Sequence, residues 1–347
     1  MQTLAIAERA FDRHAELHPL ATYMGIVSLH GLARLAVLTG DSRLREKARA
    51  ELLPFVRGER EQSSRNFKNY ACGGNGTAFL LWKGLLPEAR ATVAAYADEL
   101  IHDAPRDPGG IYCMPGGARQ GAIWIDVAFA VSPFLLFAGL ALDRGECLEE
   151  ACDQTLKMVA VFRDPANGLL HQSRDFKGKG LLSEDHWSRG NGWGMLALTE
   201  LANYLPARHP RRLAVETAFV DLLNACLAVQ DAEGMWHQEL TWNEASWPGS
   251  YVETSGSGLI LYGLGVALEK GLLPAERRDD FERGMRSYLD YITPAGDVFH
   301  TCQGCLCPGE GRMLDYAARA TKRNDSHAFG PVNLAFGQAW QLGITDL

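Results

Sequence analysis

The segment His186-Trp187-Ser188-Arg189-Gly190-Asn191-Gly192-Trp193 lies near the middle of the chain, between a long polar stretch and an apolar helical pattern. This position predicts a helix N-terminus, where free backbone N–H groups and the helix dipole favour an anion. The arginine can form a fork to a carboxylate, and the two indoles offer flat apolar faces of the kind on which sugar rings pack. The simpler interpretation is a helix entry capped by Asn191, with Trp193 in the core.

The composition is that of an ordinary globular protein, with 47% hydrophobic and 22% charged residues among 347. The net charge is -8 and no basic stripe is present, which excludes nucleic acid as a partner. No apolar run is long enough to cross a membrane, and the first residues lack a signal peptide's pattern. We therefore expect a cytoplasmic protein with one domain over residues 1–347 and eight free cysteines. The oligomeric state stays open.

Hydrophobic periodicity predicts an almost entirely helical chain. The predicted helices span residues 3–17, 22–39, 42–57, 75–86, 88–103, 124–142, 147–163, 191–205, 211–229, 256–270, 275–292 and 331–342. Short turns alternate with long connections, which occupy residues 58–74, 104–123, 164–190, 230–255 and 293–330. Loops of that length inside a compact domain are usually functional. In an up-and-down array of helices, all of the long connections fall at the same end.

The long connections also resemble one another. The stretch Asn167–Gln172 is similar to Glu233–Gln238, and weaker copies are Ala295–His300 and Gly110–Cys113. The histidines of the first three copies, His171, His237 and His300, are separated by about one helical hairpin plus one long loop. Such a period indicates a repeat architecture.

Two kinds of helix alternate along the chain. Those that follow a long loop are apolar and often glycine-rich, as in 256–270, and glycine lets helix backbones approach closely. Their partners, such as 88–103 and 275–292, are amphipathic and carry many charges. Six apolar inner helices and six amphipathic outer ones predict an all-α fold, an (α/α)6 six-hairpin barrel. We expect the functional site at the mouth where the inner N-termini converge.

Three blocks carry a resemblance to a known family. They are Trp187–Trp193, Trp124-Ile125-Asp126 with the following Ser132–Leu135, and Tyr251–Gly258. These blocks resemble the unsaturated uronyl hydrolases of glycoside hydrolase families 88 and 105, which are six-hairpin barrels. One position departs from the family pattern, because Asn75 stands where members often carry a second acidic residue.

The resemblance implies an enzyme that removes a 4,5-unsaturated uronic acid from the non-reducing end of a lyase-generated oligosaccharide, without a metal or other cofactor. This sugar is a vinyl ether, so the demanding step is protonation of carbon, after which water adds to C5 and the hemiketal collapses. The resemblance makes Asp126 the general acid. Its neighbours Trp124, Val127 and Phe129 would bury it and raise its pKa. The alternative is that Asp126 only caps its helix.

The candidate substrate-binding side chains are aromatic, imidazole, guanidinium or small polar groups close to the long loops: Asn75, Trp124, His171, His186, Trp187, Arg189, Trp193, His237, Thr254 and Ser257. Trp236 is a further possible sugar platform. Each has a structural alternative, since isolated histidines and helical aromatics usually belong to the core. For Arg189 that alternative is a salt bridge to Glu253 or Asp185.

Other functions remain open at this level. His300, Cys302, Cys305 and Cys307 could supply four zinc ligands, although their spacing is tight. This cluster would suit a zinc-dependent barrel resembling lanthipeptide cyclases. A sugar epimerase of the acylglucosamine type would instead use paired histidines as acid and base. A non-catalytic carbohydrate-binding barrel is a further alternative, because of Asn75.

Overall fold

Six helices form a closed inner ring within the part of the chain that the computed structural model describes, residues 1–60, 67–243 and 245–347. The ring consists of α2 (Tyr23–Thr39), α4 (Gly74–Trp82), α6 (Asp126–Leu142), α8 (Ser188–Tyr204), α10 (Thr254–Glu269) and α13 (Phe329–Gln341). Each helix packs against the next one, and α13 packs against α2 to close the ring.

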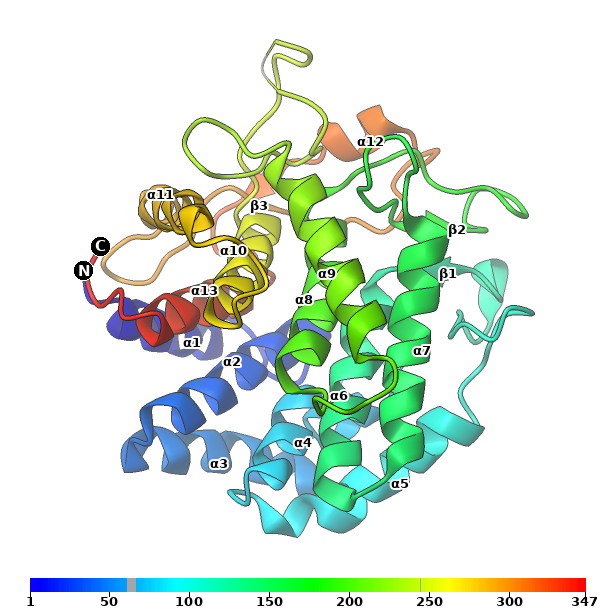
Figure 1. Cartoon of the computed structure of the whole chain (residues 1–347), viewed down its shortest axis with the longest axis vertical. Coiled ribbons are helices and arrows are strands. Elements are labelled where there is room, and N and C mark those ends of the chain that lie inside the picture. The colour runs from blue at the N-terminus through cyan, green and yellow to red at the C-terminus, as the bar shows by residue number, and fades with distance from the viewer. Residues whose placement is uncertain (61–66, 244) are drawn as a thin grey trace.

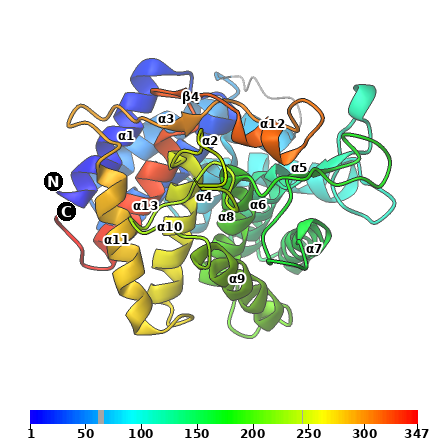
Figure 2. The ribbon, with the colours of Figure 1, turned by 90° about the horizontal axis from the view of Figure 1, so that it is seen from above.

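The outer layer consists of α1 (Thr3–Leu17), α3 (Ser42–Val56), α5 (Arg90–His102), α7 (Gly145–Phe162), α9 (Arg212–Leu227) and α11 (Arg278–Leu289). Figure 2 looks along the ring and shows α7, α9 and α11 outside the inner helices. The predicted (α/α)6 barrel is confirmed, and each predicted helix is present with small shifts at its ends. A short additional helix, α12, spans Met313–Ala317, and 3-10 turns span Lys68–Cys72, Pro87–Ala89, Gly117–Arg119 and Ala275–Arg277.

Burial explains why the two layers differ in sequence. The inner helix α6 is buried without interruption from Val127 to Gly139, so it carries apolar residues all round. The outer helix α11 buries Phe281, Gly284, Met285 and Tyr288, which recur at helical spacing on one face. Glycine is required where α8 and α10 touch, since a Cβ on Gly256 would lie 2.6 Å from the backbone nitrogen of Arg189.

Two short antiparallel pairs join the long connections. Strand β1 (Ile123–Trp124) pairs with β2 (Ser173–Arg174), and β3 (Thr301–Cys302) pairs with β4 (Thr321–Lys322). The sequence placed Trp124 at the start of a helix, and this is wrong because its backbone pairs with Ser173 instead. The β1–β2 pair fixes the loops before α6 and α8 to each other, whereas β3 and β4 pair within the one connection that precedes α13. The loops that carry β2, β3 and α12 lie at the upper end of Figure 1.

A buried polar network lies among the inner helices. His30 Nε2 lies 3.0 Å from Glu200 Oε1, and the Tyr262 hydroxyl donates to the same oxygen at 2.6 Å. Arg34 lies 3.6 Å from the other carboxylate oxygen. Burial opposes ionisation of Glu200, but the charges of Arg34 and His30 outweigh it and lower its pKa. Charges of opposite sign are therefore paired inside the barrel.

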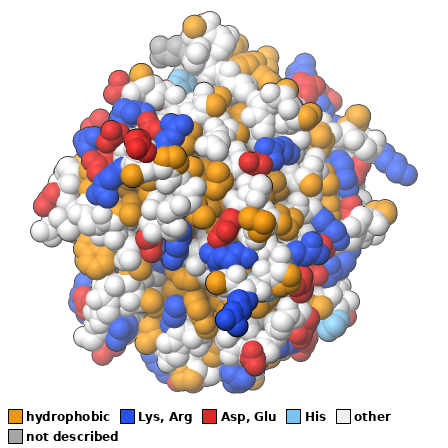
Figure 3. Space-filling model, viewed as in Figure 1, with side chains coloured by type: hydrophobic (Ala, Val, Ile, Leu, Met, Phe, Trp, Pro, Cys, Tyr) orange, Lys and Arg blue, Asp and Glu red, His pale blue; other side chains and the backbone are white. Residues whose placement is uncertain are grey.

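The surface carries both signs of charge. Acidic and basic side chains are interspersed on the face in Figure 3. Among the described residues, no helix combines the length and the apolar character needed to cross a bilayer. The two termini meet beside α1 and α13, where Thr3 donates its backbone N–H to the carbonyl oxygen of Thr345 at 3.0 Å (Figure 1).

Candidate active site

A cavity of about 280 Å³ opens at the end of the barrel where the inner helices begin. Tyr23 is the first residue of α2, Asp126 is the first residue of α6, and Trp187 is the N-cap of α8. The cavity is lined by Tyr23, Phe67, Tyr70, Trp124, Asp126, Phe129, Ala130, Trp187, Gly304, Cys305 and Leu306. Its wall is thus largely aromatic, with one carboxyl group.

Asp126 is the acidic group of this wall. Burial raises the pKa of its carboxyl to about 7, although the charge of Arg189 and a hydrogen bond from Gln172 act in the opposite direction. The carboxyl therefore keeps its proton below about pH 7, where an ordinary aspartate is ionised, while part of the side chain remains accessible from the cavity. A carboxylic acid in this state can give a proton to a bound molecule.

Gln172 is a site residue that sequence reasoning missed. Its Nε2 lies 3.5 Å from Asp126 Oδ2 and donates to the carbonyl oxygen of Cys305 at 2.7 Å. Its Oε1 accepts from the Cys307 backbone N–H at 2.9 Å and from the Tyr316 hydroxyl at 2.7 Å. The Gln172 side chain therefore links Asp126 to the 305–307 loop. The available signal was its place beside His171 in the repeated motif.

A relay of three side chains, also missed, reaches the cavity from the opposite side. His327 Nδ1 lies 2.5 Å from Asp325 Oδ1, so that nitrogen carries the proton. Nε2 then accepts a hydrogen bond from the Tyr23 hydroxyl. Burial and the positive charge of Arg189 lower the pKa of His327 to about 4, so the ring is neutral. Tyr23 and His327 lie 304 positions apart, and no local pattern links them.

Arg189 is buried and engaged by the protein. One terminal nitrogen donates to Ser255 Oγ and to the Cys302 carbonyl oxygen, each at 2.9 Å, and the other donates to the Gln303 carbonyl oxygen at 3.0 Å. Its guanidinium also lies 3.6 Å from Glu253 Oε1. The structure thus favours the salt bridge over the expected fork to a substrate, because the loop carbonyls already occupy both terminal nitrogens.

The tryptophans divide into two groups. Trp124 and Trp187 line the cavity, and their role as sugar platforms stays a prediction. Trp193 is buried and stacks on Phe129 with ring centroids 4.0 Å apart, so it supports the wall from behind. Trp236 is buried and donates its indole N–H to the Cys226 carbonyl oxygen at 2.7 Å. Trp193 and Trp236 thus pack in the core and do not line the cavity.

Four other candidates are turned toward the protein and do not line the cavity. Thr254 donates to the Phe299 carbonyl oxygen at 2.9 Å, and Ser257 accepts from the Trp236 backbone N–H at 3.0 Å. Asn75 donates to the Phe129 carbonyl oxygen at 3.1 Å. His237 Nδ1 lies 2.5 Å from Ser250 Oγ. These contacts fasten loops and helices, and none of the four side chains lines the cavity.

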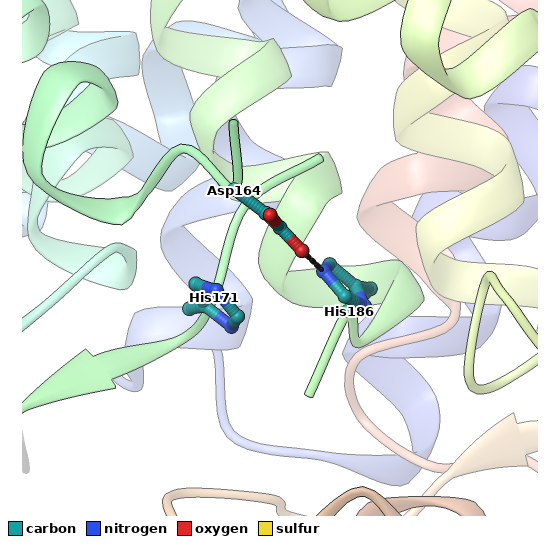
Figure 4. A group of neighbouring side chains, drawn as sticks. All are labelled: Asp164, His171 and His186. Carbon is teal, nitrogen blue, oxygen red and sulfur yellow. Dashed lines mark hydrogen bonds and ion pairs between the residues drawn. The ribbon is translucent and has the colours of Figure 1, made fainter. Parts of the chain in front are cut away.

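His171 and His186 do not line the cavity either. Both lie beside Asp164 (Figure 4). Among the described residues, this trio is the one group of three side chains placed for a metal ion. The cysteine cluster of the zinc alternative does not form such a group in the described part of the chain. Instead, Cys305 lines the cavity and Cys302 Sγ accepts from Gln238 Nε2 at 3.0 Å. All eight cysteines are free and buried, which confirms the prediction of free thiols.

A ring of six helical hairpins, with a buried carboxyl in an aromatic cavity at its mouth, is an (α/α)6 barrel, the architecture that six-hairpin glycosidases share. Within this class, the model of Glycosyl Hydrolase Family 88 matches residues 5–342, and the chain belongs to that family. The resemblance found in the sequence is thereby confirmed. The epimerase and cyclase alternatives have no support from this match.

Curated relatives have related names. The chain is 29% identical over 217 residues to the unsaturated rhamnogalacturonyl hydrolase YesR of Bacillus subtilis (strain 168), covering 61% of this chain and 60% of that protein. It is 27% identical over 158 residues to an unsaturated 3S-rhamnoglycuronyl hydrolase of Formosa agariphila, covering 43% of this chain and 41% of that protein. The matches thus span about half the length of these relatives.

Solved structures share the fold over the whole chain. A family 105 glycoside hydrolase of C. acetobutylicum ATCC 824 superposes with a TM-score of 0.85 at 20% identity, covering 98% of this chain and 100% of the other. An unsaturated glucuronyl hydrolase from Bacillus sp. GL1 gives a TM-score of 0.69 at 16% identity, covering 99% and 97%. At this identity the likeness concerns the barrel.

Proposed function

We propose that this protein is a glycoside hydrolase that removes a 4,5-unsaturated uronic acid from the non-reducing end of a small acidic oligosaccharide. The observation that carries the proposal is Asp126, a carboxyl with a pKa of about 7 in an aromatic cavity at the barrel mouth. The names of the curated relatives support the same substrate class. The free thiols agree with a reducing compartment, so we propose the cytoplasm as its location.

The reaction begins with proton transfer from Asp126 to C4 of the unsaturated sugar. The C4=C5 electron pair forms the new C–H bond, and positive charge develops on C5 and the ring oxygen. Water then adds to C5, and the Asp126 carboxylate takes up the proton that water loses. The resulting C5 hemiketal opens by breaking the C5–O5 bond, which gives a ketone at C5 and a hemiacetal at C1. The hemiacetal then becomes an aldehyde as its C1–O bond to the oligosaccharide breaks, and the hydroxyl proton on C1 passes to the leaving oxygen. A positioned acid of this kind contributes a rate factor of about 10² to 10⁴.

The cavity is suited to one terminal sugar. Its volume of about 280 Å³ is close to the lower end of the range for ligand pockets, about 300 to 1,000 Å³. Trp124 and Trp187 provide flat walls for the sugar ring. Arg189 adds positive charge from behind, because its field lowers the pKa of both Asp126 and Tyr23 against the effect of burial. Together with the inner-helix N-termini, this field favours an anionic substrate.

The test uses Asp126→Asn and a panel of lyase-generated unsaturated disaccharides, read by loss of the ultraviolet absorbance of the conjugated double bond. The wild-type protein should consume at least one member of the panel, and the variant should lose activity by about 10²-fold or more while keeping its circular dichroism spectrum. Asp221→Asn, a surface carboxylate paired with Arg163, is the control and should keep the wild-type rate. A near wild-type rate in Asp126→Asn would refute the assignment of the acid.

A further inference from the structure

Three side chains that the proposed reaction does not use meet beside the start of α8. Asp164 follows α7, His171 lies seven positions further along, and His186 immediately precedes the N-cap Trp187. One possible ligand atom from each lies within 4.8 Å of the other two. Figure 4 shows Asp164 and His186 pointing toward each other, with the His171 ring beside them. We propose that this trio binds a divalent transition-metal ion, with zinc preferred.

The backbone holds two of the ligands on one tight hairpin. The Asp164 N–H donates to the Leu169 carbonyl oxygen at 2.8 Å, and the His171 N–H donates to the Phe162 carbonyl oxygen at 2.9 Å. The turn between them needs Gly168, whose φ of +80° lies in the left-handed region. Asp164 and His171 are therefore held in place whether or not an ion is bound.

The third ligand is held by a different loop. The His186 N–H donates to the Glu239 carboxylate, 2.8 Å from Oε2, and its carbonyl oxygen accepts from the Leu240 N–H at 3.0 Å. The backbone of His186 thus links the connection before α8 to the connection after α9. Such preorganisation lowers the entropy that an ion must overcome when it orders its ligands.

The His171 imidazole is oriented as in metal sites, whereas the second nitrogen of His186 faces a carboxylate beyond hydrogen-bond distance. His171 Nδ1 lies 3.0 Å from the Asp185 carbonyl oxygen, which can only accept, so the proton is on Nδ1 and Nε2 keeps its lone pair. His186 Nε2 lies 2.9 Å from Asp164 Oδ2, and its Nδ1 lies 3.6 Å from Glu239 Oε1. Metal-binding histidines typically place their second nitrogen against a carbonyl or carboxylate, as His171 does.

A simple ion pair accounts for only part of this arrangement. The Asp164 carboxylate can accept the His186 proton, but the His171 ring then lies with its centroid 5.0 Å from that of His186 without a second acid for it. A metal ion would replace the shared proton and would be coordinated by all three side chains at once. Two imidazoles and one carboxylate are a common donor set for zinc, and a fourth position stays open for water. The Asp164 side chain is 20% exposed, which gives the ion a path of entry.

The ion would act on the neighbouring site through the chain. His171 precedes Gln172, which contacts Asp126, and His186 precedes Trp187, which lines the cavity. Zinc would therefore fix two segments that shape the active site while standing outside the reaction. Its main effect is expected on the stability of these loops, and binding releases the proton that His186 and Asp164 share.

The test titrates the EDTA-treated full-length chain with Zn²⁺ by calorimetry and with Co²⁺ by visible absorption. We expect one ion per chain, tetrahedral Co²⁺ bands, proton release and a higher Tm with Zn²⁺. His186→Asn and Asp164→Asn should each weaken Zn²⁺ binding at least about tenfold. His209→Asn is the matched control, since His209 Nε2 lies 3.4 Å from Glu149 and outside the trio, and it should bind as the wild type does.

Absence of stoichiometric Zn²⁺ binding by the wild-type chain would overturn the proposal. So would equal binding by wild type and His186→Asn when both give the same circular dichroism spectrum in EDTA. If His186→Asn does not fold, the isosteric Asp164→Asn decides, because Asp164 is partly exposed and its replacement adds no volume.

Discussion

Gln172 Nε2 lies 3.5 Å from Asp126 Oδ2, and the same nitrogen donates to the loop carbonyl of Cys305 at 2.7 Å. One amide therefore connects the proposed acid to the loop that forms part of the cavity wall. A hydrogen bond to a carboxylate stabilises its charged form. The amide thus limits how far burial raises the pKa of Asp126.

The first prediction concerns the pH dependence of catalysis. Asp126 must be protonated to act as an acid, so kcat/KM should fall as pH rises through its pKa of about 7. Gln172→Ala removes the hydrogen bond that lowers this pKa, and the alkaline limb of the profile should move to higher pH. Tyr316→Phe is the control, because it removes only the bond to Gln172 Oε1 and leaves the contact with Asp126. If the alkaline limb of the kcat/KM profile lies at the same pH in wild type and in Gln172→Ala, Gln172 does not lower the pKa of Asp126.

The second prediction concerns stability. Between the ordinary pKa of 3.8 and the folded value of about 7, the folded chain keeps a proton on Asp126 that the unfolded chain releases. The contribution of Asp126 to the free energy of unfolding of the wild type therefore decreases as pH rises through that window, and it is constant above it. Asp126→Asn has no such loss, so it should gain about 1 to 3 kcal/mol relative to wild type between about pH 4 and pH 8. Urea unfolding at both pH values measures the difference, and a pH-independent difference would argue against a buried acid.

The third prediction concerns the Tyr23 relay. Tyr23→Phe keeps the shape of the cavity but removes the hydroxyl that donates to His327, and kcat/KM should fall about tenfold, the value of about one hydrogen bond. Asp325→Asn should act in the same direction, because Asp325 fixes the proton on His327 Nδ1. The double variant should be little worse than Tyr23→Phe alone. Additive losses would show that the two residues act separately.

The fourth prediction concerns Arg189. Lysine cannot reproduce three hydrogen bonds to Ser255, Cys302 and Gln303, so Arg189→Lys should lower the free energy of unfolding by about 1 to 3 kcal/mol. Urea unfolding measures this loss directly. An unchanged unfolding free energy combined with a higher KM for the charged sugar would instead mean that the guanidinium turns outward and binds substrate.

The fold could be predicted because its signals are local and repeated. Each inner helix is buried over most of its length, so most of its residues are apolar, as α6 shows from Val127 to Gly139. The amphipathic pattern of α11 marks it as outer in the same way. The two-residue strands escaped prediction because pairs such as Trp124 with Ser173 depend on contacts between distant loops.

The candidate site was predictable where a residue opens an inner helix or, like Trp124, lies just before one. Asp126 and Trp187 begin or cap such helices, and both reach the cavity. Thr254 also begins an inner helix, yet its hydroxyl faces the Phe299 carbonyl oxygen. Position at a helix start therefore places a residue near the mouth, but its rotamer and partners depend on the loop that arrives from elsewhere.

By itself, the sequence determined the alternation of apolar and amphipathic helices, the single end that carries the long loops, and the acid among aromatic neighbours. Helical periodicity and composition act over a few residues, so they can be read from the chain. Only the tertiary structure decided that Arg189 is bound by the 302–303 loop, that Tyr23 meets His327, and that Gln172 reaches Asp126. These contacts join segments far apart in the chain, and they exist only once the ring has closed.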